Sequence, residues 1–210
     1  MSVHHSMFRT DRLKYYLVEC GTEHPSRWRK FRLWVNNFGF QSVAVYRLGQ
    51  FARRWSDKNR LVGFPFRLLH AILEYFIRMV YHVNIGAVVI GPGFYIGHIG
   101  AVYIGRIVIG SNCTLTHNVT IGEGHSVGFK GTPTLGDNIW IGTGSIIYGA
   151  ITIGNGATVI SGCVLSRSVP ERCLVGGNPG RIILQDYDNT RLFGEYGQKI
   201  KLDKTDQPSR

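Results

Sequence analysis

The chain has 210 residues, of which 44% are hydrophobic, so it can bury one good core or two small ones and is not largely disordered. Its four cysteines form no C-x-x-C pair and fit no short secreted framework, and no signal peptide or run of 18 uncharged apolar residues occurs, so we expect reduced thiols, a cytoplasmic protein and no membrane-spanning helix. The net charge of +11 comes mainly from residues 1–80, which hold 14 Lys and Arg against 5 Asp and Glu, but no nucleic-acid-binding motif accompanies this surplus.

Residues 1–83 form a basic, aromatic-rich region for which the spacing of apolar residues predicts helices. Trp28, Phe31, Val35 and Phe38 step by three and four, as one face of a helix requires. A further helix is expected after Pro65, with an apolar face of Phe66, Leu69, Ile72, Leu73, Phe76, Ile77 and Val80 and a polar face of Arg67, His70, Glu74, Arg78 and Tyr81. This apolar face either packs on the rest of the protein or, with its interleaved arginines, makes peripheral contact with an anionic inner membrane.

From residue 84 an aliphatic residue recurs at every sixth position. The unbroken series is Leu135, Ile141, Ile147, Ile153, Val159 and Leu165, and the same spacing continues upstream, with one slip, through Ile90, Ile96, Val102, Ile109, Leu115 and Ile121. Three such hexads make one triangular turn of a parallel β-helix, in which the aliphatic residue points inward, so about four to five coils are expected. We assign this domain to residues 84–185.

Residues 122–134 interrupt the repeat, and residues 186–210 follow it. The interruption, "GEGHSVGFKGTPT", lacks the period of six and is too long for a corner, so we expect a loop that forms one wall of a site. The segment 186–210 is a polar, charge-balanced tail to which the sequence assigns no function.

The hexads, together with "FYIGHIGAVYIG", "HNVTIG" and "GGNPGRI", resemble the hexapeptide-repeat acyltransferases over roughly residues 84–183. Within that superfamily the chain is most similar to the serine O-acetyltransferase branch, which includes the acetyltransferases of exopolysaccharide and capsule synthesis. The resemblance implies a mainly β fold, a left-handed parallel β-helix with an α-helical N-terminal region. It also implies acetyl-CoA as co-substrate and a homotrimer with sites between neighbouring β-helices. A dimer of trimers is the alternative assembly, because the N-terminal helices pair trimers in the serine branch.

His98 is the candidate catalytic residue. It lies two positions after the inward Ile96, outside the aliphatic positions of the repeat, so its side chain is free to face a cleft. In the resemblance it falls on the family's catalytic histidine, which takes a proton from the acceptor hydroxyl and returns it to the leaving thiolate. The alternative role is a structural hydrogen bond.

His117 is expected in the same column as His98, one coil further along. Two stacked imidazoles could share a metal, as in the gamma-class carbonic anhydrases, but the third ligand would have to be a loop residue such as His125. We therefore expect no metal, and interpret His117 as a polar wall residue that contacts the acceptor.

The acceptor is predicted from departures from the serine-acetylating pattern. Gly97 stands where that pattern has an aspartate, Val83 stands where the imidazole-orienting aspartate falls, and Gly131 and Thr132 replace an arginine and a histidine. Free serine needs an anion for its ammonium and a cation for its carboxylate. We therefore expect a neutral sugar hydroxyl as acceptor, with serine as the alternative if Lys130 or Arg106 substitutes for the missing cation.

The remaining candidate residues bind the two substrates. Asn84, on the acceptor side, or a backbone carbonyl could hold the second imidazole nitrogen of His98. In relatives the pantetheine arm lies along small corner residues, which in this sequence are Thr143, Gly144, Ser161 and Gly162. Basic residues approach the CoA phosphates in relatives, and the matching residues here are Arg167 and Arg181. The sequence therefore predicts a cytoplasmic, homotrimeric O-acetyltransferase acting on a saccharide acceptor in a cell-envelope polysaccharide or its precursor.

Overall fold

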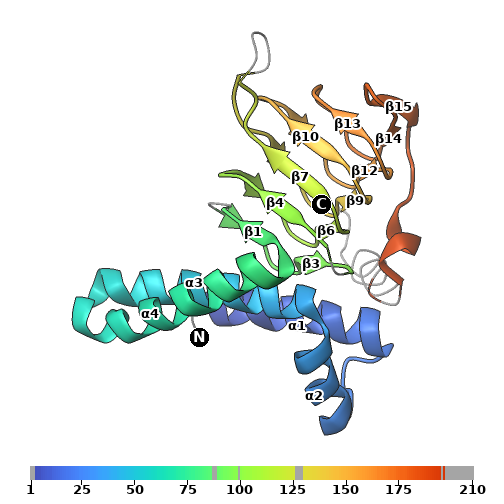
Figure 1. The fold of residues 1–210 in the computed structure, drawn as a ribbon. Helices are drawn as coiled ribbons and strands as arrows, with labels where there is room; N and C mark the ends of the chain where they lie inside the picture. The colour runs from blue at the N-terminus through green and yellow to red at the C-terminus, as the bar shows by residue number, and fades with distance from the viewer. Residues whose placement is uncertain (1–2, 87–88, 99, 126–129, 195, 197–210) are drawn as a thin grey trace, which may run out of the picture.

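A base of four helices carries a triangular β-solenoid in the computed structural model (Figure 1). The structure describes residues 3–86, 89–98, 100–125, 130–194 and 196, with side chains described from residue 7 onward in these ranges. The helices are α1 (Val3–Cys20), α2 (Arg27–Asn36), α3 (Phe38–Lys58) and α4 (Arg60–Phe76), and a π-helical turn, η1 (Ile77–Tyr81), leads into the solenoid. Within the described ranges, no helix combines the length and the apolar character needed to cross a membrane.

Three sheets form the three faces of the solenoid, because successive short strands belong to successive faces. The first sheet consists of β1 (Val83–Ile85), β4 (Val102–Ile104), β7 (Val119–Gly122), β10 (Ile146–Tyr148) and β13 (Val164–Leu165). The second sheet consists of β2 (Val89–Ile90), β5 (Val108–Ile109), β8 (Thr134–Leu135) and β11 (Thr152–Ile153). The third sheet consists of β3 (Tyr95–Ile96), β6 (Thr114–Leu115), β9 (Trp140–Ile141), β12 (Thr158–Val159), β14 (Leu174–Gly176) and β15 (Arg181–Leu184). Neighbouring strands pair in parallel except β14 and β15, which are antiparallel.

The aliphatic residues of the six-residue repeat fill the inside of the coils, as the sequence predicts. Ile96, Leu115 and Ile141 form one inward column of the third sheet, and each is at most 1% exposed. The members of the series from Leu135 to Leu165 are each at most 2% exposed. Because a single triangular coil encloses too little apolar surface to be stable alone, the stacked neighbours produce the continuous core.

The interruption of the repeat lies between β7 and β8. Gly124 and Gly131 exchange backbone hydrogen bonds and form an antiparallel bridge. The side chains of His125 and Lys130 are exposed. Residues 126–129 of the predicted loop 122–134 lie outside the described residues.

α1 is a helix that hydrophobic spacing does not reveal, because its buried face carries charged residues. Asp11 and Lys14 are fully buried beside Tyr15. Arg47 of α3 pairs with Asp11, with Nε 2.7 Å from Oδ2, and donates a further hydrogen bond to the carbonyl oxygen of Ile90 in the first coil. Removing one partner of such a buried pair costs about 3–5 kcal/mol, so the pair fastens α1 and α3 to the solenoid.

Lys14 joins α1 to both the solenoid and the C-terminal segment. Its Nζ donates, at 2.7–3.2 Å, to the backbone carbonyl oxygens of Gly93, Asn112 and Cys113. The ring centres of Phe193 and Tyr196 lie 4.9 and 5.2 Å from Nζ. Burial lowers the pKa of the Lys14 ammonium to about 7. The described part of the segment that the sequence leaves without a function thus packs on α1, partly through the 3-10 helix η2 (Thr190–Phe193).

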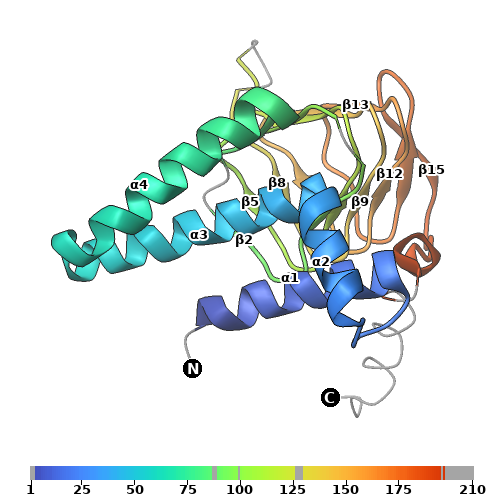
Figure 2. The same cartoon turned by 60° about the horizontal axis from the view of Figure 1, so that its bottom comes forward.

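α4 begins earlier than predicted and turns a different face to the protein. The side chain of Asn59 accepts hydrogen bonds from the first backbone N–H groups of the helix, so the helix starts before Pro65 and includes it. His70, predicted for the polar face, instead packs against Gly49 of α3, where the missing side chain leaves room for the imidazole. Four residues of the predicted apolar face are exposed: Leu69, Ile72, Phe76 and Val80. Figure 2 shows α3 and α4 extending together away from the solenoid.

Candidate active site

The structure gathers most of the predicted site residues at one corner of the solenoid, where the third sheet passes into the first. We call this the histidine corner; it comprises residues 97–101, 116–118, 142–144 and 160–162 of successive coils. His98 and His117 lie in its first two levels, and Thr143 and Ser161 lie in the next two. Residues that are far apart in the sequence therefore line one edge.

His98 is exposed on a corner that is two residues longer than the corners of the later coils. Its backbone is left-handed, with φ of 65°, a conformation that few non-glycine residues adopt. The additional length includes Gly100, where a Cβ atom would lie 2.8 Å from Cβ of His117. Gly100 thus lets the longer corner fold down onto the second level and brings the two histidines together.

The imidazole rings of His98 and His117 meet edge to face, with their centres 5.8 Å apart. Nδ1 of His117 is inaccessible to solvent and has no hydrogen-bond partner among the described residues. His82 precedes β1 at the same corner, also in a left-handed conformation, and was not identified from the sequence. No group of three His, Cys, Asp or Glu side chains in the described ranges is arranged to hold a metal ion.

The small residues predicted for the donor continue the column above His117. The N–H of Gly144 donates to the carbonyl of His117 at 3.2 Å, and that of Gly162 donates to the carbonyl of Thr143 at 2.7 Å. Gly144 and Gly162 both have φ of 73°, which explains glycine at these corners by backbone conformation alone. The space above them is also empty: a Cβ atom on Gly162 would meet nothing within 4 Å, and one on Gly144 nothing within 3.9 Å. A slender chain could lie along this edge.

The other predicted residues lie at different distances from the histidine corner. Asn84 is half-buried in β1, on the first sheet, and the structure shows no hydrogen bond between it and His98. Arg181 begins β15 beside Gly176, at the upper end of the third sheet, and is exposed. Arg167 follows β13 and lies at the next corner, apart from the column. One chain therefore does not bring Arg167 to the other donor residues.

A carboxylate that sequence reasoning missed approaches this corner from α1. Tyr95 lies beside Gly97, where a Cβ atom would be 3.8 Å from the tyrosine hydroxyl oxygen. That hydroxyl donates a 2.6 Å hydrogen bond to Oε1 of Glu19, which also accepts from the side chain of Asn37. Burial and the contact with Glu19 raise the pKa of Tyr95, so its proton stays in place. Nothing in the local sequence signals this contact, because it joins residues 76 positions apart.

The structure does not bring either of the two residues predicted to replace the missing cation into contact with the other described site residues. Arg106 and Lys130 are exposed, and neither makes a hydrogen bond or ion pair with the described residues. A Cβ atom on Gly131 would lie 2.7 Å from Cβ of Ala150, so this backbone is packed against the fourth coil. Val83 points into the core at 5% exposure and cannot orient an imidazole.

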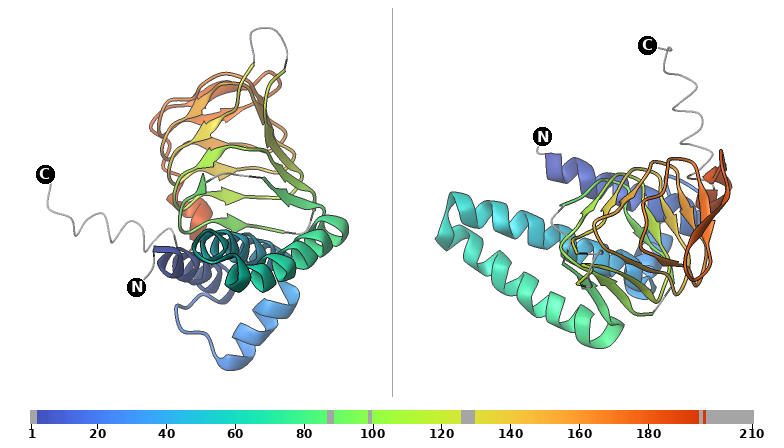
Figure 3. Two further views of the ribbon diagram at one scale, coloured as in Figure 1. Left: turned by 90° about the vertical axis from the view of Figure 1, so that its left-hand side faces the viewer. Right: turned by 90° about the horizontal axis from the view of Figure 1, so that it is seen from above.

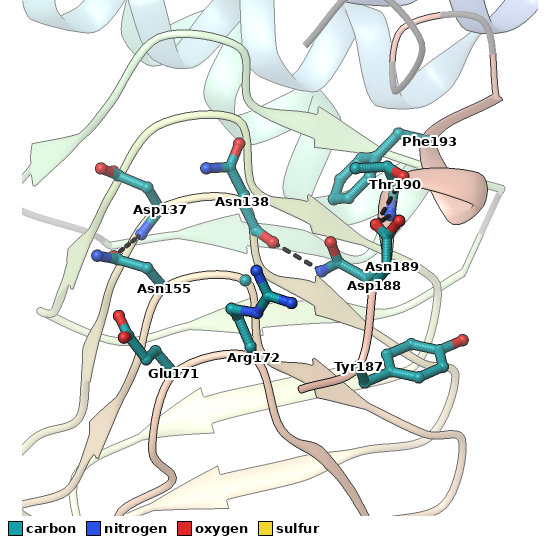
Figure 4. A pocket seen from close by; sticks show the side chains of 11 residues that line it. Asp137, Asn138, Asn155, Glu171, Arg172, Tyr187, Asp188, Asn189, Thr190 and Phe193 are labelled. Carbon is teal, nitrogen blue, oxygen red and sulfur yellow. Dashed lines mark hydrogen bonds between the residues drawn. The ribbon is translucent and has the colours of Figure 1, made fainter. Parts of the chain in front are cut away.

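A cavity of about 480 Å³ lies at a different corner, between the second and third sheets (Figure 4). Figure 4 shows the guanidinium of Arg172 pointing toward the C-terminal segment, whereas the carboxylate of Asp137 points away from it. Nδ2 of Asn189 donates to the carbonyl of Asn138 at 2.8 Å and attaches that segment to the solenoid. None of the predicted site residues lines this cavity.

The comparisons with known proteins identify serine acetyltransferases. No protein-family model matches the chain. The serine acetyltransferase of Synechococcus elongatus is 33% identical over 148 residues, which cover 69% of this chain and 57% of that protein. A soybean serine acetyltransferase of known structure is 30% identical, with a TM-score of 0.64, and the match covers 86% of this chain and 69% of the solved chain. A Brucella abortus serine acetyltransferase solved with coenzyme A has the same fold, at 24% identity and a TM-score of 0.66, over 86% of this chain and 68% of that one.

These matches support the fold and correct the finer resemblance. The fold is the predicted left-handed parallel β-helix with an N-terminal helical region. The relatives are named serine acetyltransferases, so the predicted closeness to exopolysaccharide and capsule acetyltransferases is not supported. The chain spans less than two thirds of the length of the curated relatives it matches. On the soybean match and the shared β-helix, the chain belongs to the serine acetyltransferase family.

Proposed function

We propose that this protein transfers the acetyl group of acetyl-CoA to a hydroxyl group, with serine as the acceptor. The observation that carries the proposal is the histidine corner, where an exposed His98 stands at the foot of an open edge lined by small residues. The names of the relatives support both the donor and the acceptor. The sequence alone favours a saccharide, so the experiment below compares serine with saccharides as acceptors.

His98 acts as the general base. Its neutral imidazole accepts the proton of the acceptor hydroxyl while the hydroxyl oxygen forms a bond to the thioester carbonyl carbon. The tetrahedral intermediate then collapses, the carbon–sulfur bond breaks, and the imidazolium returns the proton to the thiolate. The products are the O-acetyl ester and free CoA, and His98 is again neutral. His117 lines the acceptor side of the same corner.

The donor lies along the open edge. Thr143, Gly144, Ser161 and Gly162 leave room for the pantetheine arm, because no side chain projects into the space above the glycines. Arg181, at the end of this edge, carries a guanidinium suited to the CoA phosphates. Arg167 reaches a donor only from a neighbouring subunit, which is consistent with a homotrimer whose sites lie between chains.

Glu19 supplies the anion that serine requires. A charged ammonium group is bound favourably only where an anion or several acceptors face it. Tyr95 borders Gly97, and its hydroxyl donates a hydrogen bond to Oε1 of Glu19. In the described part of the chain Glu19 has no ion-pair partner. This carboxylate thus stands near the position from which the family's aspartate is missing.

A saccharide acceptor is the second candidate, favoured by the missing carboxylates at positions 83 and 97. The test is CoA release from acetyl-CoA with serine, with ethanolamine, with 3-hydroxypropanoate and with a panel of neutral saccharides. Serine and ethanolamine carry the ammonium, and 3-hydroxypropanoate does not. We expect Glu19→Gln to raise KM about tenfold for serine and ethanolamine and to leave 3-hydroxypropanoate unchanged.

The matched control is Glu171→Gln, an exposed carboxylate at the other corner, which should leave every KM unchanged. Turnover of saccharides without turnover of serine would replace serine by the second candidate. Serine turnover that Glu19→Gln leaves unchanged would keep the acceptor and remove Glu19 from the site.

A further inference from the structure

The outward face of α4 and η1 is apolar along its whole length. Six residues at spacings of three and four are each more than half exposed, and we call them the outer stripe: Leu61, Phe64, Leu68, Ile72, Tyr75 and Met79. At about 1.5 Å per residue, α4 and η1 together extend over about 33 Å. Contiguous apolar surfaces of this size mark interaction sites in soluble proteins.

The helix pair formed by α3 and α4 carries large apolar side chains on its outer side as well as between the two helices. Between the helices, Phe66 packs edge to face on Phe51 with the ring centres 5.3 Å apart. His70 fits against Gly49, and Gly63 approaches the backbone of Ser56. Glu74 lies 3.8 Å from His70 on the same side. An amphipathic helix normally turns its apolar face to the protein. Here the outer stripe is a second apolar surface that points outward, so it requires cover from another source.

The charged residues around the outer stripe indicate what kind of partner binds this surface. The charged residues of α3 and α4 with η1 that reach solvent include six bases, Arg53, Arg54, Lys58, Arg60, Arg67 and Arg78, against two acids, Asp57 and Glu74, whose side chain is 40% exposed. The neighbouring helix α2 repeats this composition, since its four basic residues and exposed Trp28, Phe31 and Trp34 are accompanied by no acid. Basic residues interleaved with large apolar ones are the composition that binds anionic lipid surfaces.

We propose that the outer stripe docks on the surface of an anionic phospholipid bilayer. The alternative cover, a second copy related by two-fold symmetry, would bring the same six basic residues against one another. Figures 1 and 3 show α2 and the α3–α4 pair at the same end of the solenoid. Since no described helix can span a membrane, the helix lies flat with its stripe in the interface. This proposal is independent of the proposed reaction.

The test is co-sedimentation of the full chain with vesicles of phosphatidylcholine alone and of phosphatidylcholine with phosphatidylglycerol. We expect binding to the anionic vesicles, weakened by salt, and little binding to the neutral ones. The double variant Leu68→Glu with Ile72→Glu should lower the partition coefficient at least about tenfold, because it removes apolar contacts and adds repulsion. Replacing Arg60, Arg67 and Arg78 by glutamine should weaken only the component that depends on anionic lipid.

Leu192→Glu is the matched control, an exposed leucine outside the helical base, and it should bind like the wild type. The proposal is overturned if the wild-type protein stays in the supernatant with anionic vesicles. It is also overturned if the double variant reduces the mass of the assembly in sedimentation velocity, since a second copy would then be the cover.

Discussion

At the scale of single residues, the left-handed backbone of His98 determines how its role can be tested. Alanine at φ of 65° would strain the corner, whereas asparagine tolerates this conformation, as Asn118 does one coil above. We expect His98→Asn to fold normally and to lower kcat by at least about a hundredfold, the loss typical of a missing general base. CoA release under saturating substrates measures it, together with the thermal midpoint.

The control for this variant is His24→Asn, which removes an exposed histidine between α1 and α2 and should keep full activity. If His98→Asn keeps kcat within a few fold while remaining folded, His98 is a structural residue, and His117 becomes the candidate base.

The glycines of the histidine corner allow the donor site to be blocked without strain. Asparagine already occupies the left-handed position of the second level, so Gly162→Asn should be accommodated by the backbone and should fill the empty space above it. We expect KM for acetyl-CoA to rise about tenfold or more with an unchanged thermal midpoint. Steady-state kinetics at varied acetyl-CoA measures this change.

Gly156→Asn is the matched control. Gly156 has a left-handed backbone at the corner that lines the 480 Å³ cavity, and Asn112 and Asn138 have left-handed backbones at the same corner in earlier coils. An unchanged KM in Gly162→Asn would assign the small residues to corner formation alone.

At the residue scale, the sequence predicts a position correctly where the six-residue repeat alone determines it. His98 and His117 could be assigned to one column by counting hexads, and the structure brings their rings together. Glu19 could not be found in this way. Its approach to Tyr95 depends on how α1 docks on the third sheet, and no local pattern encodes that docking.

At the scale of elements, the attachment of α1 through Lys14 predicts a dependence of stability on pH. Burial lowers the pKa of Lys14 from 10.5 to about 7, so between these values the unfolded chain binds more protons than the folded one. Stability from this group is therefore present at high pH and is lost as the pH falls toward 7. We expect the free energy of unfolding to rise by about 1.5 kcal/mol between pH 7 and pH 8.5 on account of this group.

Lys14→Met isolates this contribution, because it keeps the length of the side chain and removes the titration. Urea unfolding of both proteins at the two pH values gives the difference, and the variant should lack the rise of the wild type. The variant should also be less stable by about 1–3 kcal/mol, since three carbonyl oxygens lose their donor. Equal pH slopes in the two proteins would mean that the Lys14 amine keeps the same proton count when the chain folds.

The same element explains where the hydrophobic pattern fails. In the β-helix every sixth side chain must fill the coil, so the period is visible in the sequence and the core is predicted. In α1 the buried positions include Asp11 and Lys14, which satisfy backbone groups of the first coils, so no apolar period marks the helix. In α4 the error is the reverse, because the apolar period is present but four of the seven residues of the predicted apolar face point outward.

At the scale of the whole molecule, the outward side of the first sheet lacks the cover that its composition requires. Tyr103 and Ile146 are 52% and 43% exposed on either side of Thr120 in the outward column, which continues from the edge of the histidine corner. Parallel sheets are normally covered on both faces. The helical base contacts the first sheet at β1, through η1, so a neighbouring subunit is the natural cover for the later strands of this sheet.

We therefore expect the wild type to sediment at three times the chain mass of 23.6 kDa, or at six times if trimers pair. Ile146→Asp should dissociate the trimer and abolish CoA release, because it places an unpaired charge at the centre of the interface and separates the chains that form each site. Circular dichroism should be unchanged, since the side chain points away from the core. Val108→Asp, an equally exposed aliphatic position on the second sheet, is the control. If Val108→Asp dissociates the assembly and Ile146→Asp does not, the second sheet is the interface, and the active sites must be built against that face instead.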